Sequence, residues 1–167
     1  GNDGFGGTLR SALAIEGVRL DRVLPTPECC SGVAMIGVED SGQNCITVVP
    51  GANGLLTSDD VQAQAEEFAR ADVLLLQLEV PVETVLTAIK LARTNDVLTI
   101  LDPAPAVLNF PPELLNVDVV CPNESEAALL TGVEITTAKS ARHAAGKLQQ
   151  LGARHAIITL GDKGAVF

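Results

Sequence analysis

Polar side chains and glycines follow four short hydrophobic segments of this chain, and their types suit ligand binding. They are Glu79, Asp102, Asn123, Glu124, Glu126 and the turn Gly161-Asp-Lys-Gly164. Carboxylates and amides can bind sugar hydroxyls or hydrated Mg²⁺, and a glycine turn can hold an anion through backbone N–H groups. Because carboxylates that gather at one place repel one another, their convergence would favour a cation or hydroxyl-rich ligand between them.

The hydrophobic segments that precede these residues predict the elements that position them. The segments are 72–78, 97–101, 117–121 and 154–160. Short apolar runs separated by helix-length stretches are typical of parallel strands in an α/β sheet. Since ligands bind beyond the carboxyl ends of such strands, we expect the polar residues to lie along one edge of the sheet.

Caps and prolines mark the helices between the strands. We predict helices at 3–17, 59–70, 81–95, 123–131 and 137–151, and a short one opened by Pro111 and Pro112. Thr57 or Ser58 would cap the second helix, and Gly17 would end the first. Residues 18–30 are predicted as a connection in which a short strand could form, and a new strand begins at Ala165.

Two β-rich segments precede the α/β alternation and differ from it in pattern. Residues 31–38 and 44–49 flank the turn composition Glu39-Asp-Ser-Gly-Gln43. This arrangement predicts a hairpin, an antiparallel ribbon separate from the main sheet. We therefore divide the chain into an α/β core, residues 1–30 and 51–167, and a β hairpin, residues 31–50.

Composition excludes several classes of function. The 167 residues can bury a core, and the net charge of −10 argues against nucleic-acid partners and anionic membrane surfaces. No apolar stretch is long enough to span a bilayer. The four cysteines lack the spacing of a metal site, which favours free thiols in a reducing cytoplasm. We accordingly expect a cytoplasmic protein without nucleic-acid or membrane partners.

Several of these residues also have simpler interpretations. Asn123-Glu-Ser-Glu126 could be a plain helix cap, and Gly161 to Gly164 an ordinary tight turn. His143 and His155 are expected to be structural or solvated, Cys121 to be buried, and Met35 to contribute packing. Residue types alone leave these alternatives open.

Nine segments in chain order carry a resemblance to a known family. They are Gly1-Asn-Asp-Gly-Phe-Gly6, Ser31-Gly-Val-Ala-Met-Ile36, Gly42-Gln-Asn44, Pro50-Gly-Ala-Asn53, Gln77-Leu-Glu79, Asp102-Pro-Ala-Pro105, Pro122-Asn-Glu-Ser-Glu126, Leu130-Thr-Gly132 and Thr159-Leu-Gly161. Together they resemble the ribokinase, or PfkB, family of carbohydrate and nucleoside kinases. The resemblance implies a three-layer α/β fold with a mostly parallel sheet and a small antiparallel β lid.

The resemblance also implies an activity and its partners. We expect ATP-dependent phosphorylation of a sugar, D-ribose to ribose 5-phosphate, with Mg²⁺ as cofactor and a monovalent cation such as K⁺ in the full-length protein. The partners would be the small sugar, ATP and a second subunit, in a homodimer formed through the lid. The alternatives are another sugar or a nucleoside as acceptor, or a non-catalytic protein that binds ligands or dimerises.

Roles follow for the residues that match the family segments. Ala34, Ile36 and Val48 match lid residues that cover the sugar, and Glu79 matches a carboxylate that binds its hydroxyls. Asn123 matches a residue near the ATP phosphates, and Glu126 one that meets magnesium through water. The nucleotide-binding turn would comprise Thr159, Leu160, Gly161, Asp162, Lys163 and Gly164.

The chain also departs from the family pattern. Many ribokinases have Asn where this chain has Asp102, so Asp102 is either a source of repulsion or an added ligand of metal-bound water. The family's first strand, its glycine-rich sugar segment and its Gly-Ala-Gly-Asp element, which supplies the catalytic base, have no match in residues 1–167. No catalytic base is therefore assigned, and we expect residues 1–167 alone to be inactive.

The lid makes a further prediction about register. Side chains alternate faces along a strand, so Ala34, Ile36 and Val48 share a face only if Ile36 lies opposite an even-numbered residue. We predict that Ile36 pairs with Val48, which leaves the three-residue loop Ser41-Gly-Gln43 with one residue in the left-handed region, or that an equivalent bulge is present. A pairing of Ile36 with Thr47 would contradict this prediction.

Overall fold

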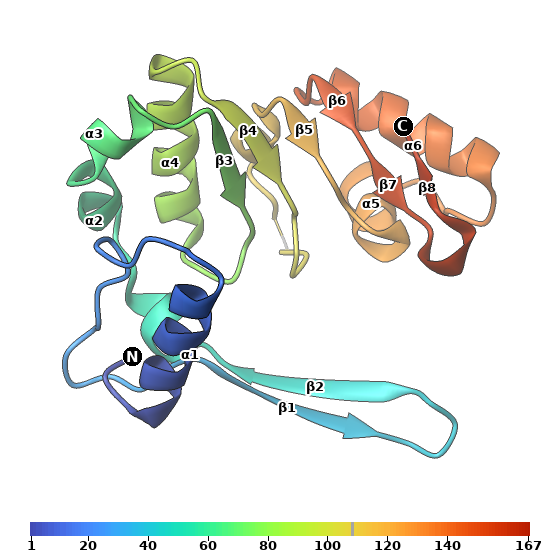
Figure 1. The fold of residues 1–167 in the computed structure, drawn as a ribbon. Coiled ribbons are helices and arrows are strands. Elements are labelled where there is room, and N and C mark those ends of the chain that lie inside the picture. The colour runs from blue at the N-terminus through green and yellow to red at the C-terminus, as the bar shows by residue number, and fades with distance from the viewer. Residues whose placement is uncertain (108) are drawn as a thin grey trace. The chain divides into compact units, whose positions relative to one another are not determined.

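The structure is a computed structural model that describes residues 1–107 and 109–167. The chain divides into two compact units, Gly1–Leu56 and Thr57–Phe167, and Figure 1 shows the elements of each. Residues 1–30 lie in the same compact unit as the β hairpin. From the sequence we assign them to the α/β core instead, and that assignment stays a prediction. Among the described residues, no helix has both the length and the apolar character that crossing a bilayer requires.

The second unit, Thr57–Phe167, is built on the predicted parallel sheet. Its strands are β3 (Val73–Leu76), β4 (Leu98–Leu101), β5 (Val119–Val120) and β6 (His155–Ala156). They are hydrogen-bonded in the order β3-β4-β5-β6, and each neighbouring pair is parallel. The α/β class and the single direction of the sheet are thus confirmed.

Helices alternate with these strands. They are α2 (Ser58–Gln62), α3 (Ala65–Phe68), α4 (Val82–Thr94), the 3-10 helix η2 (Pro112–Leu115), α5 (Glu124–Thr131) and α6 (Ala138–Gln150). The predicted helix at 59–70 is wrong in one respect, because it breaks into α2 and α3 around Ala63 and Gln64. No proline or glycine lies between Ser58 and Phe68, so the sequence carries no signal for this break.

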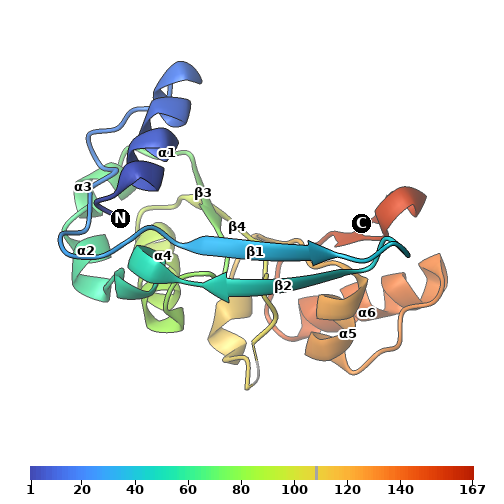
Figure 2. The same cartoon turned by 90° about the horizontal axis from the view of Figure 1, so that it is seen from below.

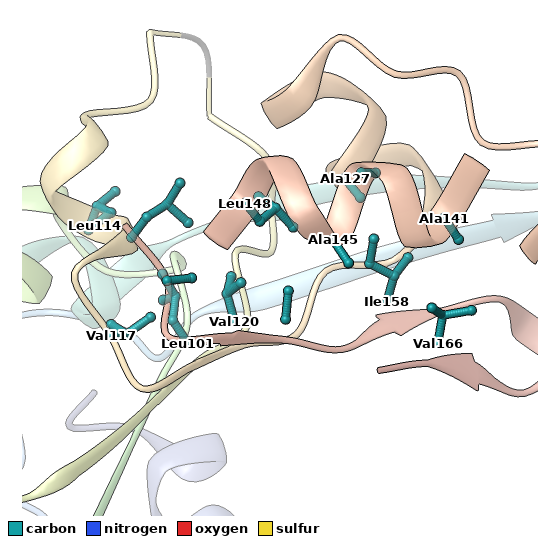
Figure 3. Packing of buried hydrophobic residues seen from close by; sticks show 14 of the residues in the cluster. Leu101, Leu114, Val117, Val120, Ala127, Ala141, Ala145, Leu148, Ile158 and Val166 are labelled. Atoms are coloured by element: carbon teal, nitrogen blue, oxygen red, sulfur yellow. The ribbon is translucent and has the colours of Figure 1, made fainter. Parts of the chain in front are cut away.

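The core of the second unit lies between the strands and the helices α4, α5 and α6. Leu101 and Val120 of the sheet are fully buried, as are Leu148 of α6 and Ile158. Figure 3 shows these side chains gathered between α6 and the strands. Each such side chain contributes about 1.5–3 kcal/mol by leaving water, so this cluster fixes where the strand ends lie.

The predicted strand 154–160 is divided at Ile157. Its first part, β6, continues the parallel sheet, and its second part, β7 (Ile158–Thr159), forms an antiparallel pair with β8 (Ala165–Val166). Backbone hydrogen bonds continue past the division, because Ile157 N donates to Val120 O at 2.9 Å and Thr159 N to Pro122 O at 3.0 Å. The segment therefore stays aligned with the β5 segment up to its polar end.

The first unit, Gly1–Leu56, consists of a helix, a hairpin and a connecting loop. Its elements are α1 (Gly4–Ile15), β1 (Val33–Val38), β2 (Asn44–Val49) and the 3-10 helix η1 (Gly51–Leu55). Each strand of the hairpin has six residues, and Figure 2 shows β1 and β2 running side by side in opposite directions. Residues 18–30 form turns and loops, so the strand considered there does not occur. Helix α1 carries large apolar side chains that stay exposed, with Phe5 63% and Leu9 58% accessible.

The register of the hairpin confirms the shared face but corrects the pairing. Ile36 lies opposite Ile46, and Val48 lies opposite Ala34, so the predicted partner of Ile36 was wrong by two residues. The loop has three residues as expected, but they are 40–42, since Glu39 N donates to Gln43 O at 2.8 Å. The reason is Gly42, whose φ of 83° supplies the left-handed residue that such a loop requires at its third position.

Candidate active site

Polar residues leave three neighbouring segments at the carboxyl edge of the sheet, as the sequence predicts. Hydrogen bonds between the segments continue beyond the strands themselves. Asp102 N donates to Leu76 O at 2.8 Å, and Cys121 N donates to Leu101 O at 2.8 Å. The β3, β4 and β5 segments are thus held together up to their first polar residues, which gives this edge a defined backbone.

Asn123 and Glu126 form a reciprocal cap at the start of α5. Glu126 N donates to Asn123 Oδ1 at 2.9 Å, and Asn123 N donates to Glu126 Oε2 at 2.9 Å. The simple capping interpretation is therefore confirmed, and it explains why both residues are fixed. Glu126 is only 8% exposed. Within the described chain its second oxygen, Oε1, has no hydrogen-bond partner, which leaves one acceptor for a ligand or water.

The glycine turn lies beside this cap. A parallel bridge pairs Asn123 with Thr159, the last residue of β7. Because the bridge joins two predicted site residues from distant parts of the sequence, the structure brings the cap and the turn together. The two local motifs do not predict this pairing, because it depends on the order of the strands in the sheet.

The turn itself closes the β7–β8 hairpin. Leu160 N donates to Gly164 O at 2.8 Å, and the residues between form the short 3-10 helix η3 (Gly161–Lys163). Gly161 and Gly164 have φ of 59° and 87°, in the region that favours glycine. The tight-turn interpretation is thus also confirmed. Among the described residues, the N–H groups of Gly161 and Asp162 make no hydrogen bond, so they remain available to an anion.

Glu79 lies in the loop that follows β3, and its side chain is exposed. Its N–H donates to the side-chain oxygen of Gln77, which keeps the loop tight. Leu78 N donates to Ala104 O at 2.8 Å, so this loop runs beside the Asp102-Pro-Ala-Pro105 segment. The structure brings Glu79 next to that segment but does not join its carboxylate to Asn123 or Glu126.

Asp102 and Cys121 follow the neighbouring strands β4 and β5, and both side chains are partly withdrawn from water. Partial burial raises the pKa of the Asp102 carboxyl. Burial also raises the pKa of the Cys121 thiol, and the nearby charge of Asp102 adds to that shift. Cys121 is half-buried rather than fully buried as predicted, and it is a free thiol, as are the other three cysteines.

The residues present fit a metal that is held mainly by other ligands. No group of three or more His, Cys, Asp or Glu side chains gathers as a metal cage within 1–107 and 109–167. Mg²⁺ commonly binds proteins through one or two carboxylates and keeps several waters. The free oxygen of Glu126 meets that limited requirement, whereas Asp102 shows no contact that assigns it to the same ion.

The hairpin presents the three predicted sugar-contacting residues on one face. Ala34, Ile36 and Val48 share this face with Ile46, which lies opposite Ile36. The side chains of Ile36, Ile46 and Val48 are 60%, 52% and 58% exposed, so the face is open to a ligand. Sequence reasoning missed Ile46 because the assumed register placed Val48 in its position.

The remaining candidates from the sequence are His143, His155 and Met35, none of which is assigned to the site. His155 stacks on Phe167 with ring centroids 5.6 Å apart. His143 is an exposed residue of α6, and Met35 is 70% exposed on the opposite face of the hairpin from Ile36. Met35 therefore does not pack as predicted among the described residues.

Comparison with known proteins gives consistent matches along the chain. The family model described as pfkB family carbohydrate kinase matches residues 1–167. The chain is 37% identical to ribokinase from Haemophilus influenzae, over 98% of this chain and 54% of the relative. It is 34% identical to deoxyribokinase from Salmonella typhi, over 100% of this chain and 55% of the relative.

A solved structure extends the match to three dimensions. Arabidopsis thaliana ribokinase complexed with ribose and ATP has a TM-score of 0.87 and 32% sequence identity, covering 99% of this chain and 54% of that one. The chain thus spans about half the length of the relatives it matches.

Proposed function

Because the chain belongs to the pfkB family of carbohydrate kinases, we propose that it is part of an enzyme that phosphorylates D-ribose from ATP. The observation that carries the proposal is the bridge between Asn123, which caps α5 together with Glu126, and Thr159, which leads into the turn 161–164, in a chain similar to ribokinases throughout. The products would be ADP and ribose 5-phosphate. Phosphoryl transfer needs positioning and charge neutralisation above all, and an edge of this kind can provide both.

The nucleotide would bind where the cap and the glycine turn lie together. We assign Thr159, Leu160, Gly161, Asp162, Lys163 and Gly164 to this subsite, with the amide of Asn123 beside the phosphates. Free N–H groups of the turn can hold phosphate oxygens, and the Lys163 ammonium adds positive charge. Bound Mg²⁺ would neutralise phosphate charge, and Glu126 would orient a metal-bound water through Oε1 while Oε2 stays in the cap.

The sugar would bind through one carboxylate and one apolar face. Glu79 accepts hydrogen bonds from sugar hydroxyls, and charge-assisted bonds of this kind are stronger than neutral ones. Ala34, Ile36, Ile46 and Val48 cover the sugar with apolar surface and exclude water. Exclusion matters because water would otherwise compete with the sugar for the phosphoryl group.

The catalytic base is not assigned to any residue of 1–167. We propose that it belongs to the full-length enzyme outside this range, together with the site of a monovalent cation such as K⁺. Residues 1–167 alone are then expected to form no ADP in response to ribose. Ribose-dependent ADP release by the 167-residue chain would contradict this assignment.

We also propose a homodimer through the β hairpin. An isolated two-stranded ribbon is marginally stable in water, and its open edges favour pairing with another chain. Both faces carry exposed apolar residues, including Met35, Val33 and Val49 on the face opposite Ile36. Sedimentation analysis of the full-length protein tests this: a concentration-independent monomer would exclude the dimer.

The central experiment measures ADP formation by the full-length protein with ribose, and in variants of two site residues. Glu79→Gln should raise the KM for ribose at least tenfold, because a neutral amide replaces a charged acceptor, with the KM for ATP unchanged. Glu126→Gln should lower kcat at limiting Mg²⁺. Since Gln at this position still completes a capping box, that variant removes charge while it keeps the helix start.

Glu134→Gln provides the matched control, because Glu134 is exposed and lies outside the edge. It should leave both KM values and kcat unchanged. The proposed function fails if the wild-type protein releases no ADP with any sugar, or if Glu79→Gln behaves like the control.

A second acceptor also has support. The similarity to a deoxyribokinase makes 2-deoxyribose the main competitor of ribose as substrate. Rates with ribose, 2-deoxyribose, fructose and a nucleoside at equal concentration distinguish these acceptors. A higher kcat/KM for 2-deoxyribose than for ribose would replace ribose in the proposal.

A further inference from the structure

Three sequence segments of the first unit meet at one place. The proposed function assigns no role to the residues of these segments. They are Gly1 to Gly6, Cys29 to Ser31 and Gly51 to Ala52. Asn2 N donates to Cys29 O at 2.9 Å, and Ala52 N donates to Cys30 O at 2.9 Å. These bonds surround the two points at which the hairpin leaves the rest of its unit, and we call this set the hairpin root.

Asp3 is the centre of the hairpin root. Its Oδ1 accepts from Gly6 N at 2.8 Å and from Ser31 Oγ at 2.8 Å, while its Oδ2 accepts from Ser31 N at 2.8 Å. Asp3 is the N-cap of α1, and Ser31 lies two residues before β1. One carboxylate therefore joins the first turn of a helix to the start of the hairpin.

The surroundings leave this link little freedom. Ser31 is only 2% exposed. A Cβ at Gly51, whose φ is 52°, would lie 2.6 Å from Cys30 O, so the returning strand passes directly against the outgoing one. The hydrogen bonds from Gly6 N and from Ser31 lower the pKa of the Asp3 carboxyl to about 2. The carboxylate is therefore ionised at neutral pH.

We propose that Asp3 is a positioning residue for the sugar-binding face of the hairpin, acting through Ser31 at its root. The inference rests on the proposed function, because it assumes that Ala34, Ile36, Ile46 and Val48 contact the sugar. A hairpin whose own residues are exposed cannot be held by its side chains. Its orientation in the first unit then depends on the root, and loss of the Asp3–Ser31 link lowers the fraction of molecules with the face in place. The apparent affinity for sugar falls in proportion to the fraction of molecules with the face in place, whereas the rate of phosphoryl transfer in the occupied site is unchanged.

Asp3→Asn separates this role from simple helix capping. Asn is as good an N-cap as Asp, and its oxygen can still accept from Gly6 N. Its NH₂ group replaces Oδ2, however, and faces the Ser31 N–H as a second donor. The variant therefore keeps the start of α1 and breaks the link to the hairpin. Ser31→Ala is the milder test, because it removes the hydroxyl bond and keeps the bond from Ser31 N.

The matched control is Asp21→Asn in the same unit. Asp21 is a surface residue whose carboxylate pairs with Arg19 at 2.6 Å. The control makes the same chemical change and removes the same charge. It does so away from the hairpin root.

Steady-state kinetics of the full-length protein give the first measurement. Asp3→Asn should raise the KM for ribose roughly tenfold and leave kcat and the KM for ATP within about twofold. Ser31→Ala should raise the KM for ribose by a smaller factor, and Asp21→Asn should change none of the three. An equal loss of kcat and of affinity for both substrates would show a general structural defect and overturn the inference.

Amide hydrogen exchange gives a second measurement that does not depend on activity. Asp3→Asn should speed exchange at residues 33–38 and 44–49, while the amides of α1 keep the protection of the wild type. Unchanged exchange in the hairpin would overturn the inference even if the protein is a sugar kinase. If no sugar supports turnover, the proposed function fails, and the exchange result alone decides whether Asp3 anchors the hairpin.

Discussion

The hairpin and the parallel sheet are built from similar apolar residues, yet they use them in opposite ways. All twelve residues of β1 and β2 are exposed. In β4, by contrast, Thr99 is 1% exposed and Leu101 is fully buried, because α4 and the neighbouring strands cover them. Valine, isoleucine and leucine therefore do not by themselves determine burial. The elements that pack against them do.

This difference matches two kinds of task. The apolar side chains of the second unit pack in its core, and this packing fixes the strand ends that carry polar residues. The hairpin leaves an apolar face exposed, as the proposed sugar-binding role requires, and relies on its root and its turn for shape. Substitutions should therefore act globally in the second unit and locally in the hairpin.

The largest contrast is expected between two isoleucines. Ile158→Ala removes a fully buried side chain and should lower the free energy of unfolding by about 2–5 kcal/mol. Ile46→Ala removes one that is 52% exposed and should change it by less than about 0.5 kcal/mol. Denaturant unfolding of both variants measures the difference, and equal losses would mean that the hairpin face is covered in solution.

The next effect concerns Asp118, whose carboxylate joins two strands of the sheet as Asp3 joins the parts of the first unit. Asp118 Oδ2 accepts from Thr99 N at 2.9 Å and from Thr99 Oγ1 at 3.1 Å. Asp118→Ala leaves the buried Thr99 without these bonds and should cost about 1–3 kcal/mol of unfolding free energy. Asp21→Ala, on the surface, should cost far less.

The same carboxylate predicts a pH dependence. The bond from Thr99 N, with help from Arg154, lowers the pKa of Asp118 in the folded protein. A carboxyl whose pKa is lower in the folded than in the unfolded protein stabilises the folded state. This contribution is fully present when the pH lies above the unfolded pKa of about 4, and it is lost as the pH falls through the folded pKa. The stability difference between wild type and Asp118→Ala should therefore shrink below about pH 4. A difference that stays constant down to pH 2 would contradict the cited bond as its cause.

A smaller effect is expected at the cap of α5. Asn123→Ala removes the acceptor of Glu126 N and should cost about 1 kcal/mol, whereas Asn123→Asp keeps the cap and should cost little. Thermal unfolding separates this contribution from any effect on the nucleotide. If both variants are equally destabilised, the amide of Asn123 has a role beyond the cap.

The smallest global effect is expected in the hairpin loop. Gly42→Ala places a side chain at a φ of 83° and should cost about 1 kcal/mol, felt as faster amide exchange in β1 and β2 alone. Gly146→Ala, in helix α6 with open space around the position, should instead stabilise the second unit by about 0.5–1 kcal/mol. A drop in overall melting temperature for Gly42→Ala would mean that the two units unfold together.

Sequence reasoning performed best where the signal is local. The caps at Thr57 and Asn123, the helix start at Pro81 and the turn at Gly161 are each defined within a few residues, and the structure has them all. It failed where distant contacts decide, as in the break between α2 and α3. It also failed where two local patterns were nearly equivalent, as in the hairpin loop, which the position of Gly42 settled.

Local sequence patterns are enough to predict the class of the fold, the order of its elements and the residue types at the carboxyl ends of the strands. Periodicity and caps are encoded locally, so one chain suffices to find them. The folded chain is needed to see that Asn123 lies beside Thr159, that Ile46 lies opposite Ile36, and that Asp3 joins a helix to the hairpin. These pairings bring together residues up to dozens of positions apart, and strand order, register and close packing select them through many weak contacts at once.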